Sequence, residues 1–188
     1  MSLLVAAVVG YAVGSVSFAT LLARRRGVDL RASGSGNPGA TNIGRVLGRK
    51  AGIAVALADV AKGLVPAALF GLVLHDAGLV AGVAATFGHV TSPLLHGRGG
   101  KGVATAGGAI LGSHPAWGPL VIVVWLLVVL LTRWVALGSS VAALSVPVFA
   151  ALLTPRRGDL VWSAALAAIV VARHRRNFVR RWTARRGA

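Results

Sequence analysis

Residues 3–23 read LLVAAVVGYAVGSVSFATLLA, and Arg24, Arg25 and Arg26 follow directly. About 20 apolar residues in a row are enough for a helix to cross the hydrocarbon core of a bilayer. The positive charges come after the apolar stretch, whereas a cleaved signal peptide carries them before it. We therefore expect residues 3–23 to form a retained first membrane helix.

The composition of the whole chain also indicates a membrane environment. Of its 188 residues, 56% are hydrophobic and 13% are charged, and the mean hydropathy is +0.78. An ordinary soluble domain carries about 25% charged residues, so we predict an all-α integral membrane protein. The chain has no cysteine, which excludes disulfides and thiolate metal sites.

Seven apolar runs are candidates to cross the bilayer. They are residues 3–23, 51–74, 77–95, 102–113, 117–131, 135–153 and 160–172. The fourth, fifth and seventh runs are short, so each either re-enters the membrane or requires local thinning of the bilayer. If all seven cross, seventeen Lys and Arg residues face one side, and only Arg156 and Arg157 face the other. If the fourth run does not cross, the division becomes eleven against eight, which the positive-inside rule disfavours.

This charge distribution predicts about seven transmembrane helices, with the N-terminus out and the C-terminus in. No soluble second domain is apparent, so residues 1–188 are expected to form a single membrane-embedded domain. The net charge of +16 is also compatible with nucleic-acid binding. However, the basic loops lack the interleaved aromatic residues that such binding uses, so we expect no nucleic-acid partner.

The first basic loop contains ASGSGNPGATN, residues 32–42. Its glycines match G-x-G-x-x-G, but apolar helices flank the loop, and a dinucleotide-binding fold needs a preceding strand. Small residues leave backbone N–H groups able to face an anion, and Arg45 can bind phosphate through two hydrogen bonds. The candidate ligand-binding residues are Gly34, Ser35, Gly36, Asn37, Gly39, Thr41, Asn42 and Arg45. Alternatively, these turn-forming residues make a hydrophilic connector.

The second basic loop, GRGGKGVAT at residues 97–105, repeats this chemistry. Gly99, Gly100 and Gly102 surround Lys101, and Thr105 lies one turn into the next predicted helix. A lysine between glycines at a helix N-terminus favours an anion. Two such loops on one side of the membrane predict a phosphorylated ligand, although loops on the positive side are basic in any case.

Other polar residues lie within or beside the apolar runs. Asp59 and Lys62 are three residues apart, so they can pair on one helix face, as either a structural or a functional pair. His89 is expected to be a packing histidine. His174 and Asn177 share a helix face where the seventh run meets the membrane surface. The arginines around them are expected to bind anionic lipid headgroups.

Three regions of the chain carry a resemblance to a known family. They read GSGNPGATNIGRVLGRKAG with a downstream DVAKG, then GHVTSPLLHGRGGKGVAT, and finally RHRRN. These regions resemble the bacterial acyl-phosphate-dependent glycerol-3-phosphate acyltransferases, over nearly the whole chain. The resemblance implies a multi-pass enzyme of the bacterial inner (plasma) membrane, with its active site facing the cytoplasm.

The activity that the resemblance implies is acyl transfer from acyl phosphate to the 1-hydroxyl of sn-glycerol 3-phosphate. The products are lysophosphatidic acid and phosphate, and neither acyl-CoA, a cofactor nor a metal is implied. The expected catalytic residues are Ser35, Arg45, Lys101 and His174. The expected substrate-binding residues are Gly34, Gly36, Asn37, Gly39, Thr41, Asn42, Gly99, Gly100, Thr105 and Asn177. The other expected partners are membrane lipids, and the oligomeric state is left open.

The chain departs from the family pattern at four positions. Gly97 and Arg98 stand where an aromatic residue and a lysine are usual, Ser17 where proline is usual, and Ala136 where serine is usual.

The acidic residues of the chain are Asp29, Asp59, Asp76 and Asp159 alone. They suggest no catalytic triad or carboxylate pair on the inner side. We therefore expect a substrate-assisted reaction in which His174 positions the substrate.

No metal site is expected, because the sequence gives His89 and His174 no nearby carboxylate on the inner side. The alternative function is a small membrane transporter for an organic phosphate, because glycine-rich segments and buried charges occur in transporters as well.

Overall fold

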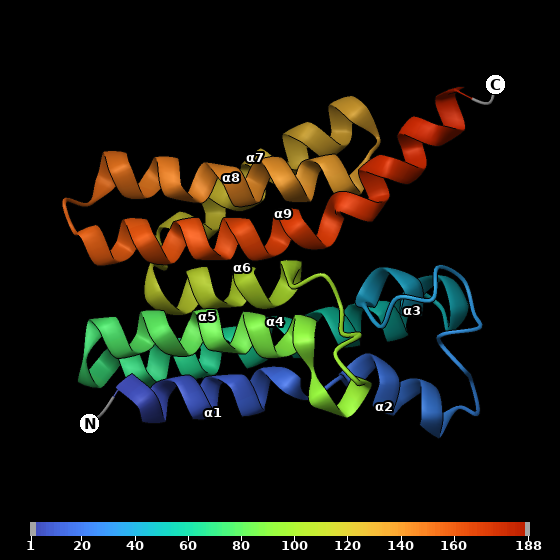
Figure 1. The fold of residues 1–188 in the computed structure, drawn as a ribbon, viewed down its shortest axis with the longest axis horizontal. Helices are drawn as coiled ribbons and strands as arrows, with labels where there is room; N and C mark the ends of the chain where they lie inside the picture. Colours follow the sequence, from blue (N-terminus) through green and yellow to red (C-terminus); the bar gives the residue numbers. More distant parts are fainter. Residues whose placement is uncertain (1–2, 187–188) are drawn as a thin grey trace. The chain divides into compact units, whose positions relative to one another are not determined.

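The computed structural model describes residues 3–186, apart from the side chain of Arg185. That arginine was counted among the tail charges above and lies outside the described side chains. Within this range the chain forms nine α-helices and one 3₁₀ turn (Figure 1). The all-α prediction is confirmed for this part of the chain. The helices form two compact units, Met1–Ser113 and His114–Ala188.

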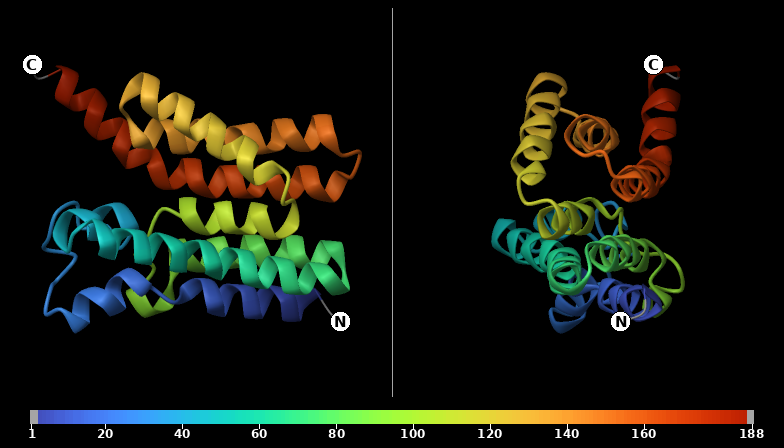
Figure 2. Two further views of the ribbon diagram at one scale, coloured as in Figure 1. Left: turned by 180° about the vertical axis from the view of Figure 1, so that it is seen from behind. Right: turned by 90° about the vertical axis from the view of Figure 1, so that its left-hand side faces the viewer.

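Unit 1 contains six α-helices and the 3₁₀ turn. They are α1 (Leu3–Ser15), α2 (Phe18–Arg25), α3 (Ala40–Val46), α4 (Arg49–Val73), α5 (His75–Thr91), the turn Pro93–Leu95, and α6 (Val103–Ser113). Helix α5 packs against α1, α4 and α6. The long helices α1, α4, α5 and α6 run in alternating directions (Figures 1 and 2). Helix α2, helix α3 and the segment between α5 and α6 therefore lie at the same end of the unit.

Small residues set the spacing of these helices. A Cβ atom on Gly14 of α1 would overlap the Ala85 carbonyl oxygen of α5, and a Cβ on Gly63 of α4 would overlap the Thr105 carbonyl oxygen of α6. Only glycine permits such close approach of two backbones, which is a common way for helices to pack within a membrane.

Unit 2 contains three longer helices, α7 (Trp117–Thr132), α8 (Val135–Leu153) and α9 (Arg157–Arg186). Helix α8 packs against both of the others, and the indole Nε1 of Trp125 on α7 donates to Ser139 Oγ on α8 at 3.2 Å. The seventh apolar run and the basic tail follow one another directly in the sequence. They form one continuous helix, α9, because no proline or glycine interrupts residues 159–186.

The membrane helices largely match the apolar runs. By length and composition, four helical segments are able to cross a membrane, namely Leu3–Arg25, Arg49–Val73, His75–Leu95 and Val135–Leu153. They coincide with the first, second, third and sixth runs. Helices α6 and α7 are shorter, and the seven-span count stays a prediction.

The first run is not a single helix. It breaks between α1 and α2, where Ser17 caps α2 by accepting a hydrogen bond from the backbone N–H of Thr20 at 3.3 Å. Serine is a favoured N-cap residue because its hydroxyl accepts from an N–H that the helix leaves unpaired.

Candidate active site

The first basic loop folds around the side chain of Asn42, which is buried at the start of α3. Asn42 Oδ1 accepts from the backbone N–H of Ser35 at 2.8 Å, and Asn42 Nδ2 donates to the carbonyl of Ser33 at 3.1 Å. Gly34 lies against the same side chain with a φ of 61°, a left-handed conformation in which a Cβ would overlap Asn42 Oδ1. Asn42 therefore holds the shape of this loop.

Two of the candidate ligand-binding side chains lie on helix α3. Thr41 and Arg45 are four residues apart, so they lie on the same face of the helix. Both are exposed, as is Ser35, whereas Asn37 and Gly39 are partly buried. Sequence reasoning placed Arg45 in a loop, because α3 is too short to show an apolar period. The structure places it in the last turn of a seven-residue helix.

The second basic loop is held against the end of α5. The N–H groups of Gly99 and Gly100 donate to the carbonyls of Val90 and His89, each at 3.2 Å. Both glycines are buried, and a Cβ on Gly100 would overlap the imidazole ring of His89. These two glycines therefore allow close packing. Lys101, which follows them, is only partly buried.

Thr105, the other polar residue expected here, is fully buried in the contact between α4 and α6. Its hydroxyl has no hydrogen-bond partner among the described residues.

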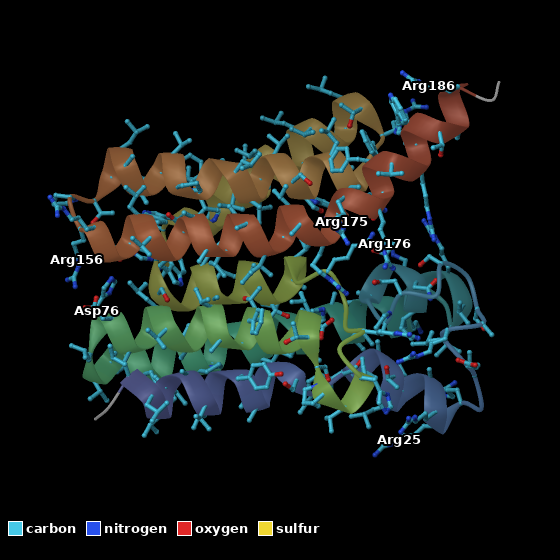
Figure 3. The ribbon with its side chains drawn as sticks, viewed as in Figure 1. Arg25, Asp76, Arg156, Arg175, Arg176 and Arg186 are labelled. Carbon is cyan, nitrogen blue, oxygen red and sulfur yellow. The ribbon has the colours of Figure 1, made fainter. Side chains whose placement is uncertain are left out.

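Both loops lie at one end of unit 1, and the residues just before them are in contact. The guanidinium of Arg31, which lies between α2 and α3, donates to the carbonyl of Leu95 at 3.0 Å. Arg25, at the end of α2, and Asp76, at the start of α5, lie at opposite ends of the unit (Figure 3). The basic residues of both loops are therefore brought to the same end, as the predicted topology requires.

The third expected segment lies on α9 in unit 2. His174 is buried, and its Nδ1 is 2.8 Å from the carbonyl oxygen of Val170. A carbonyl oxygen only accepts, so Nδ1 carries the hydrogen, and in the neutral ring Nε2 is the acceptor. Asn177 lies three residues further along α9 and is partly buried. The carbonyl of Val170 thus fixes both the tautomer and the orientation of the His174 ring.

The polar residues within the spans form a network in unit 1. The predicted pair of Asp59 and Lys62 is confirmed, with Oδ1 and Nζ 3.0 Å apart. The expectation that His89 has no nearby carboxylate is wrong, because its Nδ1 lies 3.7 Å from Asp59 Oδ1. No sequence pattern indicated this proximity, since the two residues are 30 positions apart on helices that only the tertiary fold brings together.

The fold and the site define a class: an integral membrane protein in which two basic, glycine-rich loops lie at the same end of a helical unit. The sequence model described as Glycerol-3-phosphate acyltransferase matches residues 4–184. The chain belongs to this family.

Relatives of the same name agree over nearly the full length of the chain. A glycerol-3-phosphate acyltransferase of Geobacter sulfurreducens is 44% identical, with 94% of this chain and 92% of the relative covered. One of Pseudomonas aeruginosa is 45% identical, with 91% of each chain covered. The family resemblance drawn from the three motif regions is therefore confirmed.

Solved structures agree as well. The crystal structure of PlsY, an integral membrane glycerol 3-phosphate acyltransferase, in its glycerol 3-phosphate form has a TM-score of 0.93 and 35% identity. The match covers 98% of this chain and 94% of that one. The lysophosphatidic acid form of PlsY has a TM-score of 0.91 and 34% identity, with the same coverage. This chain is accordingly a multi-pass membrane protein.

Proposed function

We propose that the protein transfers an acyl group from acyl phosphate to the 1-hydroxyl of sn-glycerol 3-phosphate, the first acylation step of phospholipid synthesis. The protein is an acyltransferase, and its products are lysophosphatidic acid and phosphate. The observation that carries the proposal is the match over 98% of the chain to an enzyme crystallised in a glycerol 3-phosphate form. The position of two basic loops at the same end of unit 1 supports it, because both substrates carry phosphate.

The reaction needs little activation beyond positioning. The 1-hydroxyl oxygen attacks the carbonyl carbon of acyl phosphate, and the bond from that carbon to the phosphate oxygen breaks. The hydroxyl proton passes to the departing phosphate. The protein holds two anions close together and stabilises the oxyanion that forms on the carbonyl.

Each site residue has a role in this step. Arg45 and Lys101 bind the phosphate of glycerol 3-phosphate, with Ser35 and Asn177 as hydrogen-bonding partners. Asn37, Thr41 and the glycines of the first basic loop lie near the acyl phosphate, and Asn42 fixes that loop from behind. His174 positions the substrate, and its ring is held by the 2.8 Å contact of Nδ1 with the Val170 carbonyl. Thr105 is buried, so it contributes through the backbone at the start of α6.

The orientation of the protein follows from its charges. We infer seven crossings of a bacterial inner membrane, with the N-terminus out and with both loops and the tail in the cytoplasm. The alternating helix directions within each unit support this topology. Within unit 2, Arg156 lies at the opposite end from Arg175, Arg176 and Arg186 (Figure 3). Residues 1–188 then make one membrane-embedded domain, which the match over residues 4–184 supports.

Membrane lipids are proposed partners of the C-terminal part of α9. The ring of Trp134 packs edge-on against Phe178, with the centroids 4.8 Å apart, and the Arg181 guanidinium lies 4.3 Å from the Trp134 centroid. Together with Trp182 they line a pocket. Aromatic rings beside arginines suit the boundary between acyl chains and anionic headgroups.

The test is an assay in which the purified protein is incubated with acyl phosphate and labelled glycerol 3-phosphate. Enzymatic activity yields labelled lysophosphatidic acid in detergent, where no compartment exists. A transporter would instead accumulate labelled glycerol 3-phosphate inside liposomes and form no lipid. Accumulation without lipid product would therefore replace the acyltransferase with the transporter.

A further inference from the structure

A buried ion pair lies in unit 1 outside the two basic loops. Asp59 and Lys62 of α4 are only 3% and 4% exposed, and their charged atoms are 3.0 Å apart. Ionisable side chains inside a membrane helix are costly, and a buried ion pair is often no more stabilising than apolar residues of similar volume. Stability of α4 is therefore a poor explanation for the pair.

Lys62 also reaches a second helix. Its ammonium donates to the carbonyl of Val16 at 2.8 Å, at the break between α1 and α2. A helix that ends leaves its last carbonyls without N–H partners, so they need other donors. The preceding carbonyl, that of Ser15, is satisfied by Ser92 Oγ at 2.6 Å. Side chains from α4 and from the end of α5 thus hold the α1–α2 break in place.

His89 connects the ion pair to the second basic loop. Its Nδ1 faces Asp59 Oδ1 at 3.7 Å, and the other side of its ring packs directly against Gly100. The carbonyls of His89 and Val90 accept the N–H groups of Gly100 and Gly99. The backbone immediately before Lys101 is therefore in contact with the ring and the main chain of one residue, His89, whose ring faces Asp59.

We propose that Asp59, Lys62 and His89 form a positioning network that fixes the backbone of residues 99–101 and so sets where the Lys101 ammonium lies. This inference rests on the proposed function only in assigning the Lys101 ammonium to the substrate phosphate. None of the three network residues needs to touch substrate. They act through the Gly99–Gly100 backbone and through the anchored α1–α2 break. A loop loosened by loss of the network would present Lys101 in many positions and bind glycerol 3-phosphate less well.

The test separates positioning from mere stability. The double variant Asp59→Leu/Lys62→Leu removes both charges together, so neither is left buried and unpaired. It should fold, with a loss of stability limited to the lost hydrogen bond from Lys62 to the Val16 carbonyl. A second variant, His89→Ala, keeps the ion pair and removes the ring beneath Gly100. The matched control is Thr86→Val on α5, which removes a buried hydroxyl that bonds only to Gly82 of its own helix.

Hydrogen–deuterium exchange of the segment 97–102 is the first readout, because it reports opening of the loop whether or not the protein is catalytic. Exchange there should be about tenfold faster in both variants, and KM for glycerol 3-phosphate should rise about tenfold with a smaller change in kcat. Thr86→Val should leave both unchanged. If Asp59, Lys62 and His89 were purely structural, the double variant would fold and would have wild-type kinetics.

Wild-type exchange in residues 97–102 together with an unchanged KM, in either variant that folds, overturns the positioning network. The proposed function is tested separately, by whether the wild-type protein makes lysophosphatidic acid. If the wild-type protein made no lysophosphatidic acid, the acyltransferase function would fail, whereas the exchange rates would still decide whether Asp59, Lys62 and His89 hold the loop.

Discussion

The backbone N–H of Ser35 donates a 2.8 Å hydrogen bond to the buried Oδ1 of Asn42. A side chain on α3 therefore holds the one loop serine that the family resemblance assigns to catalysis. The other end of the same amide binds the carbonyl of Ser33 at 3.1 Å. The geometry of the exposed loop is thus set from beneath by a residue that is 1% exposed.

Asn42→Ala should therefore lower both stability and substrate affinity. Loss of the two hydrogen bonds leaves loop groups unpaired and should reduce the free energy of unfolding by about 1–3 kcal/mol. KM for glycerol 3-phosphate should rise, because Ser35 is no longer held in place. Thermal unfolding in detergent and steady-state kinetics measure the two effects.

Ser145→Ala on α8 is the control, since its hydroxyl bonds only to Ala142 of the same helix, and it should leave the kinetics unchanged. Wild-type kinetics in Asn42→Ala would show that the loop keeps its active shape without this side chain.

The sequence predicted the helices well because long apolar runs have few alternatives. A membrane-spanning stretch must satisfy its own backbone, which leaves a helix as the simplest solution. The break at Val16 was not predicted, since the run from Leu3 to Ala23 stays apolar across it. What stabilises the break is Lys62 and Ser92, which approach from other helices, and a one-dimensional pattern carries no such information.

The residues of the two basic loops were identified from the sequence, whereas their geometry was not, and their roles in the site stay a prediction. Motif regions identified the two basic loops, and positive-inside counting placed them on one side. The roles of the glycines were harder to predict. Gly99 and Gly100 looked like anion-binding residues, but their N–H groups bond to the end of α5. Distinguishing a glycine that packs from one that binds requires knowing what lies next to it, here the ring of His89.

The C-terminal tail is expected to lie in the cytoplasm, because this orientation places seventeen basic residues inside and two outside. A reporter enzyme that works only in the cytoplasm should be active when it is fused after Ala188. A reporter that requires the periplasm should stay inactive at the same position and become active when inserted beside Arg156. The reverse pattern would invert the topology and put both basic loops in the periplasm.

Acyl phosphate, and not acyl-CoA, is expected to be the donor, and chelators should leave the rate unchanged. The chemistry needs only positioned cations, which Arg45 and Lys101 provide, because phosphate is already a good leaving group. Parallel assays with the two donors, each with and without EDTA, measure this directly. Activity that EDTA abolishes and Mg²⁺ restores would assign part of the phosphate binding to a metal ion.

Arg45→Lys and Lys101→Arg keep the charge of the two loops but change its shape. Arginine presents a planar fork with five N–H donors, whereas lysine carries a compact ammonium group. If these two cations bind one phosphate, each exchange displaces its oxygens and misaligns the attacking hydroxyl. Loss of one charge-assisted hydrogen bond should cost about 1.5–3 kcal/mol, or roughly tenfold to a hundredfold in kcat/KM for glycerol 3-phosphate.

Arg49→Lys is the matched control for these exchanges. Arg49 is exposed in the first turn of α4, four residues after Arg45, and it has no part in the proposed site. Its replacement should be silent, because topology depends on the charge alone. All three variants should insert into the membrane at wild-type levels. If Arg45→Lys and Lys101→Arg also had wild-type kcat/KM, these side chains would serve only the positive-inside rule, and the phosphate would have to be bound elsewhere.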